Sequence, residues 1–230
     1  MARLARVVIP DFPHHVTQRG NRREAIFFKD GDHEVYCGLL AEQARRCAVA
    51  VWAYCLMPNH VHLILAPKRE DGLSDAVGEA HRRYTNFINA RGGWTGHLFQ
   101  GRFCSVVMDD AHFRAAVCYV SLNPVRAGLV AQPEDWPWSS VRAHFEGKDD
   151  ALVSVRPVLD RMPHLRELLR NDCEDAFSVL RRSERTGRPA GSEDFVTKLE
   201  HLLRRPIARR APGGEWDSLT CVIFCLERGE

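Results

Sequence analysis

Hydrophobic and polar residues change their spacing several times along the first 126 residues. Runs rich in β-branched and aromatic residues, which are typical of strands, occur at 13–19, 49–57, 60–66 and 101–108. Apolar residues recur at helical spacing in 32–47 and 73–91, and again from Asp110 to Asn123. The pattern therefore predicts the element order β-α-β-β-α-β-α.

Short links between these runs indicate how the elements join. Only Pro58 and Asn59 separate the second and third strands, which predicts an antiparallel pair. Asp32 is a plausible cap for the first helix, and Pro124 is expected to end or kink the third. The order predicts an α+β fold, with a ferredoxin- or RRM-like β-α-β-β-α-β antiparallel sheet, helices on one face, and a small helical C-terminal region.

The composition changes after the sequence WPWSS at 136–140. A polar stretch follows, and 155–210 has the pattern of short helices rich in arginine. We therefore predict a first domain at 1–147 and an arginine-rich helical extension at 148–210. The tail at 211–230 has no assigned role.

The overall totals exclude some partners and leave others open. Hydrophobic residues make up 45% of the 230 residues, and the formal net charge is only +2. A nucleic-acid partner must therefore be argued from local basic clusters. The chain lacks a signal-peptide pattern, and no apolar stretch approaches the roughly 20 residues of a membrane span. We expect a cytoplasmic protein without a membrane partner.

Two histidines interrupt the apolar run MPNHVHLILAP at 57–67. Side chains at i and i+2 of a strand share a face, so His60 and His62 should project together, about 7 Å apart along the chain. Two neighbouring imidazoles can ligate one metal ion. The alternative is that both are polar residues on a solvated strand face.

The third predicted helix carries a second set of polar residues. Tyr119 and Asn123 are four residues apart and so lie on one helix face. A tyrosine oxygen can be a covalent nucleophile, and an amide oxygen suits Mg²⁺ or Mn²⁺. His112, two turns earlier on that face, is a candidate base. Alternatively, Tyr119 packs in the core, Asn123 only terminates the helix, and His112 caps or packs.

Several motifs taken together resemble the single-tyrosine HUH transposases, and among them the REP-associated tyrosine transposases. They are MPNHVHLIL, YVSLNPVRAG and WPWSS, with HHVTQRGNRREAIF, GHLFQGRFCS and TGRPAGSEDFVTKLEHLLRRP in support. The resemblance implies that 1–147 is a DNA-nicking and DNA-rejoining domain. It implies that His60 and His62 hold a divalent cation, Mg²⁺ or Mn²⁺, and that Tyr119 forms a 5′-phosphotyrosine. Asn123 matches a third ligand position, which is glutamine in some relatives.

The resemblance further implies a partner of single-stranded or hairpin DNA with REP-like repeats, bound by a monomer or homodimer. Basic residues expected at phosphates are Arg19, Arg22, Arg23, Arg82, Arg83 and Arg102. The arginine-rich stretch 181–210 favours a DNA-binding arm, and Trp94 is a possible stacking platform for bases. Two alternatives stay open: a metal-dependent phosphoesterase that uses bound water, and a hairpin-binding protein without catalysis.

Overall fold

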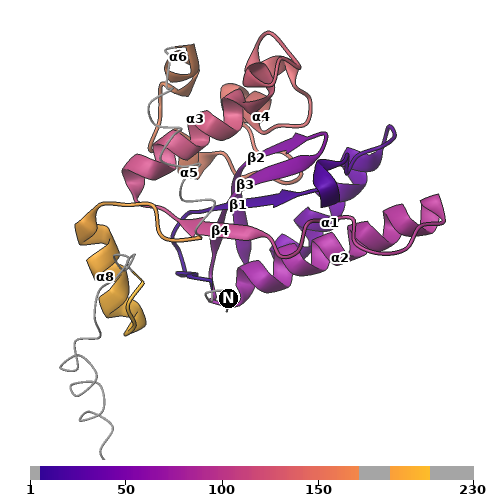
Figure 1. Ribbon diagram of the computed structural model, residues 1–230. Helices are drawn as coiled ribbons and strands as arrows, with labels where there is room; N and C mark the ends of the chain where they lie inside the picture. The colour runs from indigo at the N-terminus through magenta and orange to yellow at the C-terminus, as the bar shows by residue number, and fades with distance from the viewer. Residues whose placement is uncertain (1–5, 171–186, 208–230) are drawn as a thin grey trace, which may run out of the picture.

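A four-stranded antiparallel sheet forms the centre of the computed structural model, which describes residues 6–170 and 187–207. The strands are β1 (His14–Arg19), β2 (Val49–Met57), β3 (His60–Pro67) and β4 (Cys104–Val107), in the spatial order β2-β3-β1-β4. Figure 1 shows the sheet between two groups of helices. The predicted α+β class, the antiparallel sheet and the element order are confirmed.

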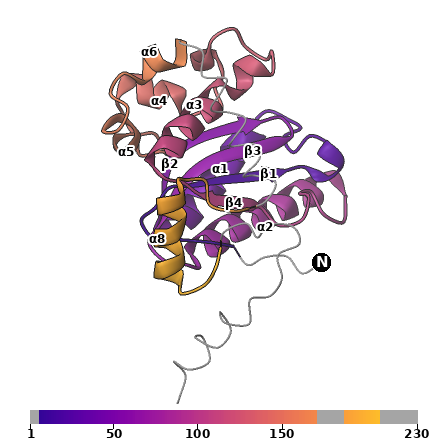
Figure 2. The same cartoon turned by 60° about the vertical axis from the view of Figure 1, so that its left-hand side comes forward.

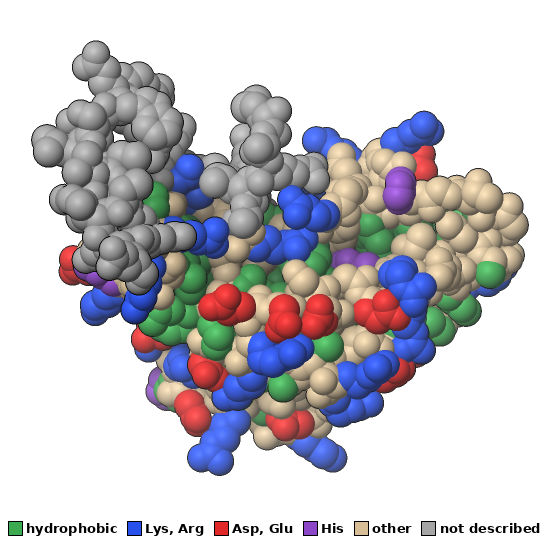
Figure 3. All heavy atoms as spheres, turned by 90° about the horizontal axis from the view of Figure 1, so that it is seen from below, with side chains coloured by type: hydrophobic (Ala, Val, Ile, Leu, Met, Phe, Trp, Pro, Cys, Tyr) green, Lys and Arg blue, Asp and Glu red, His purple; other side chains and the backbone are tan. Residues whose placement is uncertain are grey.

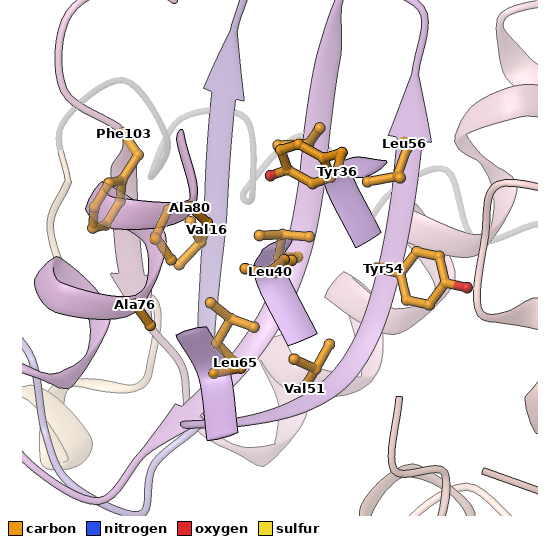
Figure 4. Close-up of a cluster of buried hydrophobic side chains, with 14 of the residues drawn as sticks. Val16, Tyr36, Leu40, Val51, Tyr54, Leu56, Leu65, Ala76, Ala80 and Phe103 are labelled. Atoms are coloured by element: carbon orange, nitrogen blue, oxygen red, sulfur yellow. The ribbon is translucent and has the colours of Figure 1, made fainter. Parts of the chain in front are cut away.

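The helices α1 (Asp32–Arg46) and α2 (Gly72–Gly92) cover one face of this sheet. Their apolar stripes pack against inward-facing strand residues, as Figure 4 shows for Tyr36 and Leu40 of α1 and Ala76 and Ala80 of α2. Burial of such apolar surface is the main force that holds the layers together. These two helices are therefore the ones expected on a single face by the β-α-β-β-α-β pattern.

The opposite face is covered by α3 (Asp110–Arg126), which lies across the sheet in Figures 1 and 2. Phe113 and Val117 of α3 share a buried cluster with Ile64 of β3 and Val106 of β4. The short helices α4 (Val141–Glu146), α5 (Arg156–Leu159) and α6 (Leu165–Arg170) pack on the same side. The 3₁₀ turns η1 (Asn21–Arg23) and η2 (Pro133–Asp135) connect elements.

Alternation along β3 explains why the two faces differ in chemistry. Val61, Leu63 and Leu65 point into the core beneath α1 and α2. His62 and Ile64 point to the α3 face, because successive side chains of a strand project to opposite sides. A single strand thus supplies apolar residues to one layer and imidazoles to the other.

Two predictions about helix ends are wrong. Gly31, with φ of 87°, occupies the N-cap of α1, and Asp32 is already helical. The Asp32 carboxylate turns back and accepts hydrogen bonds from the backbone N–H groups of Phe28 and Lys29, at 2.8 and 3.0 Å. The third helix continues past Pro124 to Arg126. The proline ring has a helical φ, and its missing N–H removes only one bond, in the last turns.

Residues beyond 147 pack on both sides of the sheet. Val153 and Val155 belong to the core beneath α1 and α2, while Val158 and Met162 belong to the α3 cluster. The helix α8 (Glu193–Leu203) packs through Leu199 on a smaller cluster near β4. The domain limits at 147 and 210 stay predictions, and the tail 211–230 lies outside the described residues.

Within the described part of the chain, none of the helices is both long enough and apolar enough to cross a membrane.

Candidate metal and tyrosine site

His60 and His62 lie on the α3 face of β3, as the i, i+2 spacing predicts. Their ring centroids are 4.9 Å apart and the ring planes are nearly perpendicular. His60 is half-buried at the start of the strand, whereas His62 is only 3% exposed. Antiparallel pairing with β1 places Thr17 opposite His62 and Arg19 opposite His60. The polar end of this face therefore holds two imidazoles and one guanidinium.

The Nδ1 atom of each histidine already has a hydrogen-bond partner. The Nδ1 atom of His60 lies 2.6 Å from Oδ1 of Asn59, which can only accept, so His60 carries its proton on Nδ1. The Nδ1 atom of His62 lies 3.1 Å from Nε2 of His15 on β1. In both rings Nε2 is then the nitrogen suited to a metal ion.

The surroundings keep both imidazoles neutral near pH 7. Burial, reinforced by the charge of Arg19, lowers the pKa of His60 to about 4. Burial lowers the pKa of His62 well below its ordinary value, with smaller contributions from His15, His60 and Arg19. A neutral imidazole has a lone pair to donate, so the protonation state suits metal binding.

Tyr119 projects from α3 onto the two buried histidines. Its ring centroid is 5.3 Å from that of His62 and 6.1 Å from that of His15, with both contacts edge-on. The guanidinium carbon of Arg126 lies 5.7 Å from the centroid of the tyrosine ring. The packing of α3 on the sheet thus places a half-buried phenol beside the histidine pair.

Asn123 follows Tyr119 by one helical turn and is half-buried. Its backbone carbonyl accepts a hydrogen bond from Ala127, and its part in metal binding stays a prediction. Residues 6–170 and 187–207 contain no group of three or more His, Cys, Asp or Glu side chains arranged to hold a metal ion. Among the described residues, the amide oxygen of Asn123 is the side-chain oxygen predicted to join the two histidines at a cation.

Two other polar side chains, the candidate base His112 and Tyr84 of α2, have structural contacts. Asp109 caps α3 by accepting from the backbone N–H of His112, and the Nδ1 atom of His112 lies 2.7 Å from the same carboxylate. His112 therefore belongs to the helix cap. Tyr84 is fully buried, and its hydroxyl donates to the carbonyl of Ile26 at 2.8 Å. It packs in the core, as its helical stripe predicts.

The arginines predicted to contact DNA fall into three groups. Arg19, Arg22 and Arg23 are exposed at the end of the sheet that carries His60. Arg102 is exposed beside a surface cavity of about 340 Å³ that borders α2. In contrast, each arginine of the pair on α2 has a carboxylate partner: Arg82 with Glu79 at 2.7 Å and Arg83 with Glu42 at 2.8 Å.

Acidic and basic side chains lie side by side on the face shown in Figure 3, so this face is not uniformly basic. Trp94 is 52% exposed and packs edge-on against Phe28. Arg181, Arg182 and Arg185 lie outside the described residues. All DNA contacts accordingly stay predictions.

Three residues near the site were not predicted from the sequence. His15 and Asn59 hold the Nδ1 atoms of the histidine pair, and Arg126 approaches Tyr119. Alternation within 13–19 places His15 on the same strand face as Thr17 and Arg19. That signal becomes informative only when β3 is known to be the neighbouring strand.

The sequence that contains this site is similar to a known protein family. Residues 10–123 match the family described as "Transposase IS200 like". Residues 10–123 belong to the IS200-like transposase family. This transposase domain contains His15, Asn59, the histidine pair, Tyr119 and Asn123, while Arg126 lies just beyond the match. The resemblance drawn from the motifs is confirmed.

Individual relatives agree with this assignment. The REP-associated tyrosine transposase of Escherichia coli strain K12 is 30% identical over 89 residues, which are 38% of this chain and 52% of the relative. A relative from Haemophilus influenzae is 26% identical over 99 residues, covering 38% of this chain and 56% of its own length. The chain spans about half the length of the curated relatives it matches.

A solved structure supports the fold. The REP-associated tyrosine transposase bound to a REP hairpin superimposes with a TM-score of 0.54 at 24% identity, over 67% of this chain and 92% of that one. At this identity the likeness shows the fold alone. The transposase domain and the solved relative share the four-stranded antiparallel sheet with its helices.

Proposed function

We propose that this protein is a transposase that nicks and rejoins single-stranded or hairpin DNA carrying REP-like repeats. The observation that carries the proposal is the position of Tyr119, whose ring lies 5.3 Å from that of His62 across the sheet–helix interface. A nucleophile beside a pair of neutral imidazoles in an IS200-like domain is the arrangement that tyrosine-mediated cleavage needs.

The residues present fit a divalent cation. Both histidines are neutral, and both have Nδ1 engaged by another group, so each would present Nε2 to Mg²⁺ or Mn²⁺. The amide oxygen of Asn123 is the proposed third ligand. When bound, the cation would supply Lewis-acid polarisation of the scissile phosphate.

Tyr119 performs the covalent step in this proposal. Its oxygen attacks phosphorus, the new bond is a 5′-phosphotyrosine ester, and the bond from phosphorus to the 3′ oxygen breaks. The tyrosine gives up its proton, and the departing strand leaves as a 3′-hydroxyl. One phosphoester replaces another, so a 3′-hydroxyl can reverse the step and rejoin DNA without ATP.

Arginines and the C-terminal extension would hold the DNA. Arg19 lies opposite His60 and is exposed, so it can contact a phosphate next to the one being cleaved. We assign 148–210 as a DNA-binding extension acting with the domain at 1–147. We also propose a cytoplasmic location, where chromosomal DNA is accessible, and a monomer or homodimer as the acting species.

Replacement of Tyr119 by phenylalanine tests the proposal. The purified full chain is mixed with 5′- and 3′-labelled REP-like hairpin DNA and Mg²⁺, then separated on a denaturing gel. The wild-type protein should nick the strand and give a protein band linked to the 5′ end. Tyr119→Phe should give neither product while still binding the hairpin.

Tyr84→Phe is the matched control, because it removes the hydroxyl of a buried tyrosine in the core on the opposite face of the sheet from His60 and His62. It should nick as the wild-type protein does. Cleavage by Tyr119→Phe without a covalent band would indicate a phosphoesterase that uses water. Binding without any cleavage by the wild-type protein would indicate a hairpin-binding protein, and either result would refute the proposal.

A further inference from the structure

A third imidazole lies behind the histidine pair. His15 on β1 is 1% exposed, and its ring stacks on that of His62 with centroids 5.2 Å apart and an interplanar angle of 18°. Its Nε2 atom is 3.1 Å from Nδ1 of His62. The two residues come from neighbouring antiparallel strands and are separated by 47 positions in the sequence. Their contact is therefore a product of the sheet.

Proton counting decides the direction of this hydrogen bond in the metal-bound protein. A neutral imidazole has one N–H and one lone pair. If Nε2 of His62 donates its lone pair to a cation, its Nδ1 atom must carry the proton and donate it. Nε2 of His15 is then the acceptor, and the proton of His15 must lie on Nδ1.

We propose that His15 is a positioning residue that fixes the tautomer and ring orientation of His62, so that Nε2 of His62 faces the cation. The inference rests on the proposed function of the site. Acceptors of this kind, placed behind a metal-binding histidine, generally raise its basicity and restrict its rotation.

The neighbouring histidines show why His15 differs from an ordinary buried histidine. His14 accepts from the backbone N–H of Ile9 at 3.1 Å, and its Nδ1 atom lies 2.8 Å from the carbonyl of Phe12. Both contacts of His14 are to the backbone and tie the preceding segment to the sheet. The Nε2 atom of His15 instead contacts a ring nitrogen of His62, a proposed metal ligand.

The other member of the pair has an equivalent arrangement. Asn59 supplies an acceptor to Nδ1 of His60 at 2.6 Å, although it comes from the β2–β3 turn and not from β1. Two different elements thus place an acceptor at the same ring atom of both histidines. This repetition favours a role in orienting the ligands over a chance packing contact.

Tyr119 adds a second constraint on His15. Its ring meets both His15 and His62 edge-on, at 6.1 and 5.3 Å. Loss of the His15 ring would therefore leave space beside the nucleophile and would remove the acceptor that His15 supplies to Nδ1 of His62. The conservative replacement must fill this space and keep an acceptor, which the side-chain amide of glutamine does.

The experiment compares His15→Leu, His15→Gln and the wild-type full chain. Mn²⁺ binding is measured by isothermal titration calorimetry without DNA, and thermal unfolding is measured without metal. His15→Leu should weaken Mn²⁺ binding roughly 10- to 100-fold, as expected for loss of an outer-shell partner. His15→Gln should restore affinity to within a few-fold of wild type. His14→Gln is the control on the opposite face and should bind Mn²⁺ normally.

The inference can be tested even if a variant folds poorly, because the tautomer of His62 is also measured in the wild-type protein. Long-range ¹H–¹⁵N NMR correlations in the presence of Mg²⁺ should show the His62 proton on Nδ1. Equal Mn²⁺ affinity of folded His15→Leu and wild type would overturn the inference and leave the proposed function intact, whereas a proton on Nε2 of His62 would contradict the inference and the proposed metal site together. A wild-type protein that binds no Mn²⁺ would overturn both.

Discussion

Acid should destabilise this fold well before its carboxylates are protonated, because several histidines are buried in their neutral form. His14, His15 and His81 are 0%, 1% and 7% exposed. Burial lowers the pKa of His14 and His15 to about 4 and that of His81 to about 3, from an ordinary value of 6.5. The folded state therefore binds fewer protons than the unfolded chain does at the same acidic pH. Stability is complete above pH 6.5 and is lost as the pH falls from 6.5 towards 4.

The size of the effect follows from the two pKa values. At pH 5 an unfolded histidine with pKa 6.5 is almost fully protonated, whereas one with pKa near 4 is mostly neutral. The difference costs about 2 kcal/mol for each histidine, or about 6 kcal/mol for the three. A domain of this kind is stable by about 5–15 kcal/mol in total. A large part of that stability should therefore disappear between pH 7.5 and pH 5.

Urea unfolding at half-unit pH steps, followed by tryptophan fluorescence, measures this loss. The single variant His81→Gln provides a matched comparison. It keeps a polar partner for the Tyr36 hydroxyl, which lies 2.9 Å from the His81 ring, and removes one titrating group. Its loss of stability over the same pH range should be smaller by about 2 kcal/mol. Equal unfolding free energies at pH 7.5 and pH 5 in the wild-type protein would refute the reasoning.

Three further predictions follow from the contacts around the site. Burial alone would raise the pKa of Asp32, but the hydrogen bonds from Arg91 and the backbone lower it to about 2. The variant Asp32→Asn should therefore lower the free energy of unfolding in urea at pH 7 by about 2 kcal/mol. A change below about 0.5 kcal/mol would contradict this. The double variant His60→Ala/His62→Ala should lose Mg²⁺-dependent nicking on a denaturing gel but keep hairpin binding in a filter assay; normal nicking would exclude the metal assignment. In the same filter assay, the exposed pair and the ion-paired pair of arginines are compared. Arg22→Gln/Arg23→Gln should weaken hairpin binding more than Arg82→Gln/Arg83→Gln does.

Local sequence patterns were sufficient for the elements that carry the metal pair and the nucleophile. The link Pro58-Asn59 predicts the β2–β3 hairpin because two residues leave no room for another connection. The i, i+2 spacing then places His60 and His62 on one face, and the helical spacing of Phe113, Val117 and Val120 identifies the buried side of α3. Each of these conclusions depends only on residues close together in the chain.

Contacts between distant segments could not be predicted in the same way. The contact of His15 with His62 depends on the strand order, which places β1 beside β3. The pairing of Arg83 with Glu42 depends on the packing of α1 against α2. Pro124 within α3 illustrates a different limit, because a proline near a helix end removes too little hydrogen bonding to stop the last turn.

The order of β3 and α3 along the chain has a consequence for protein synthesis. A nascent chain contains both histidines once β3 has been synthesised, but it lacks Tyr119 until α3 has been synthesised. In the proposed reaction, an incomplete chain that ends before α3 lacks Tyr119 and therefore cannot break a strand. Prematurely terminated products that end before α3 would therefore lack strand-cutting activity, since the proposed nucleophile lies on the helix that covers the second face of the sheet.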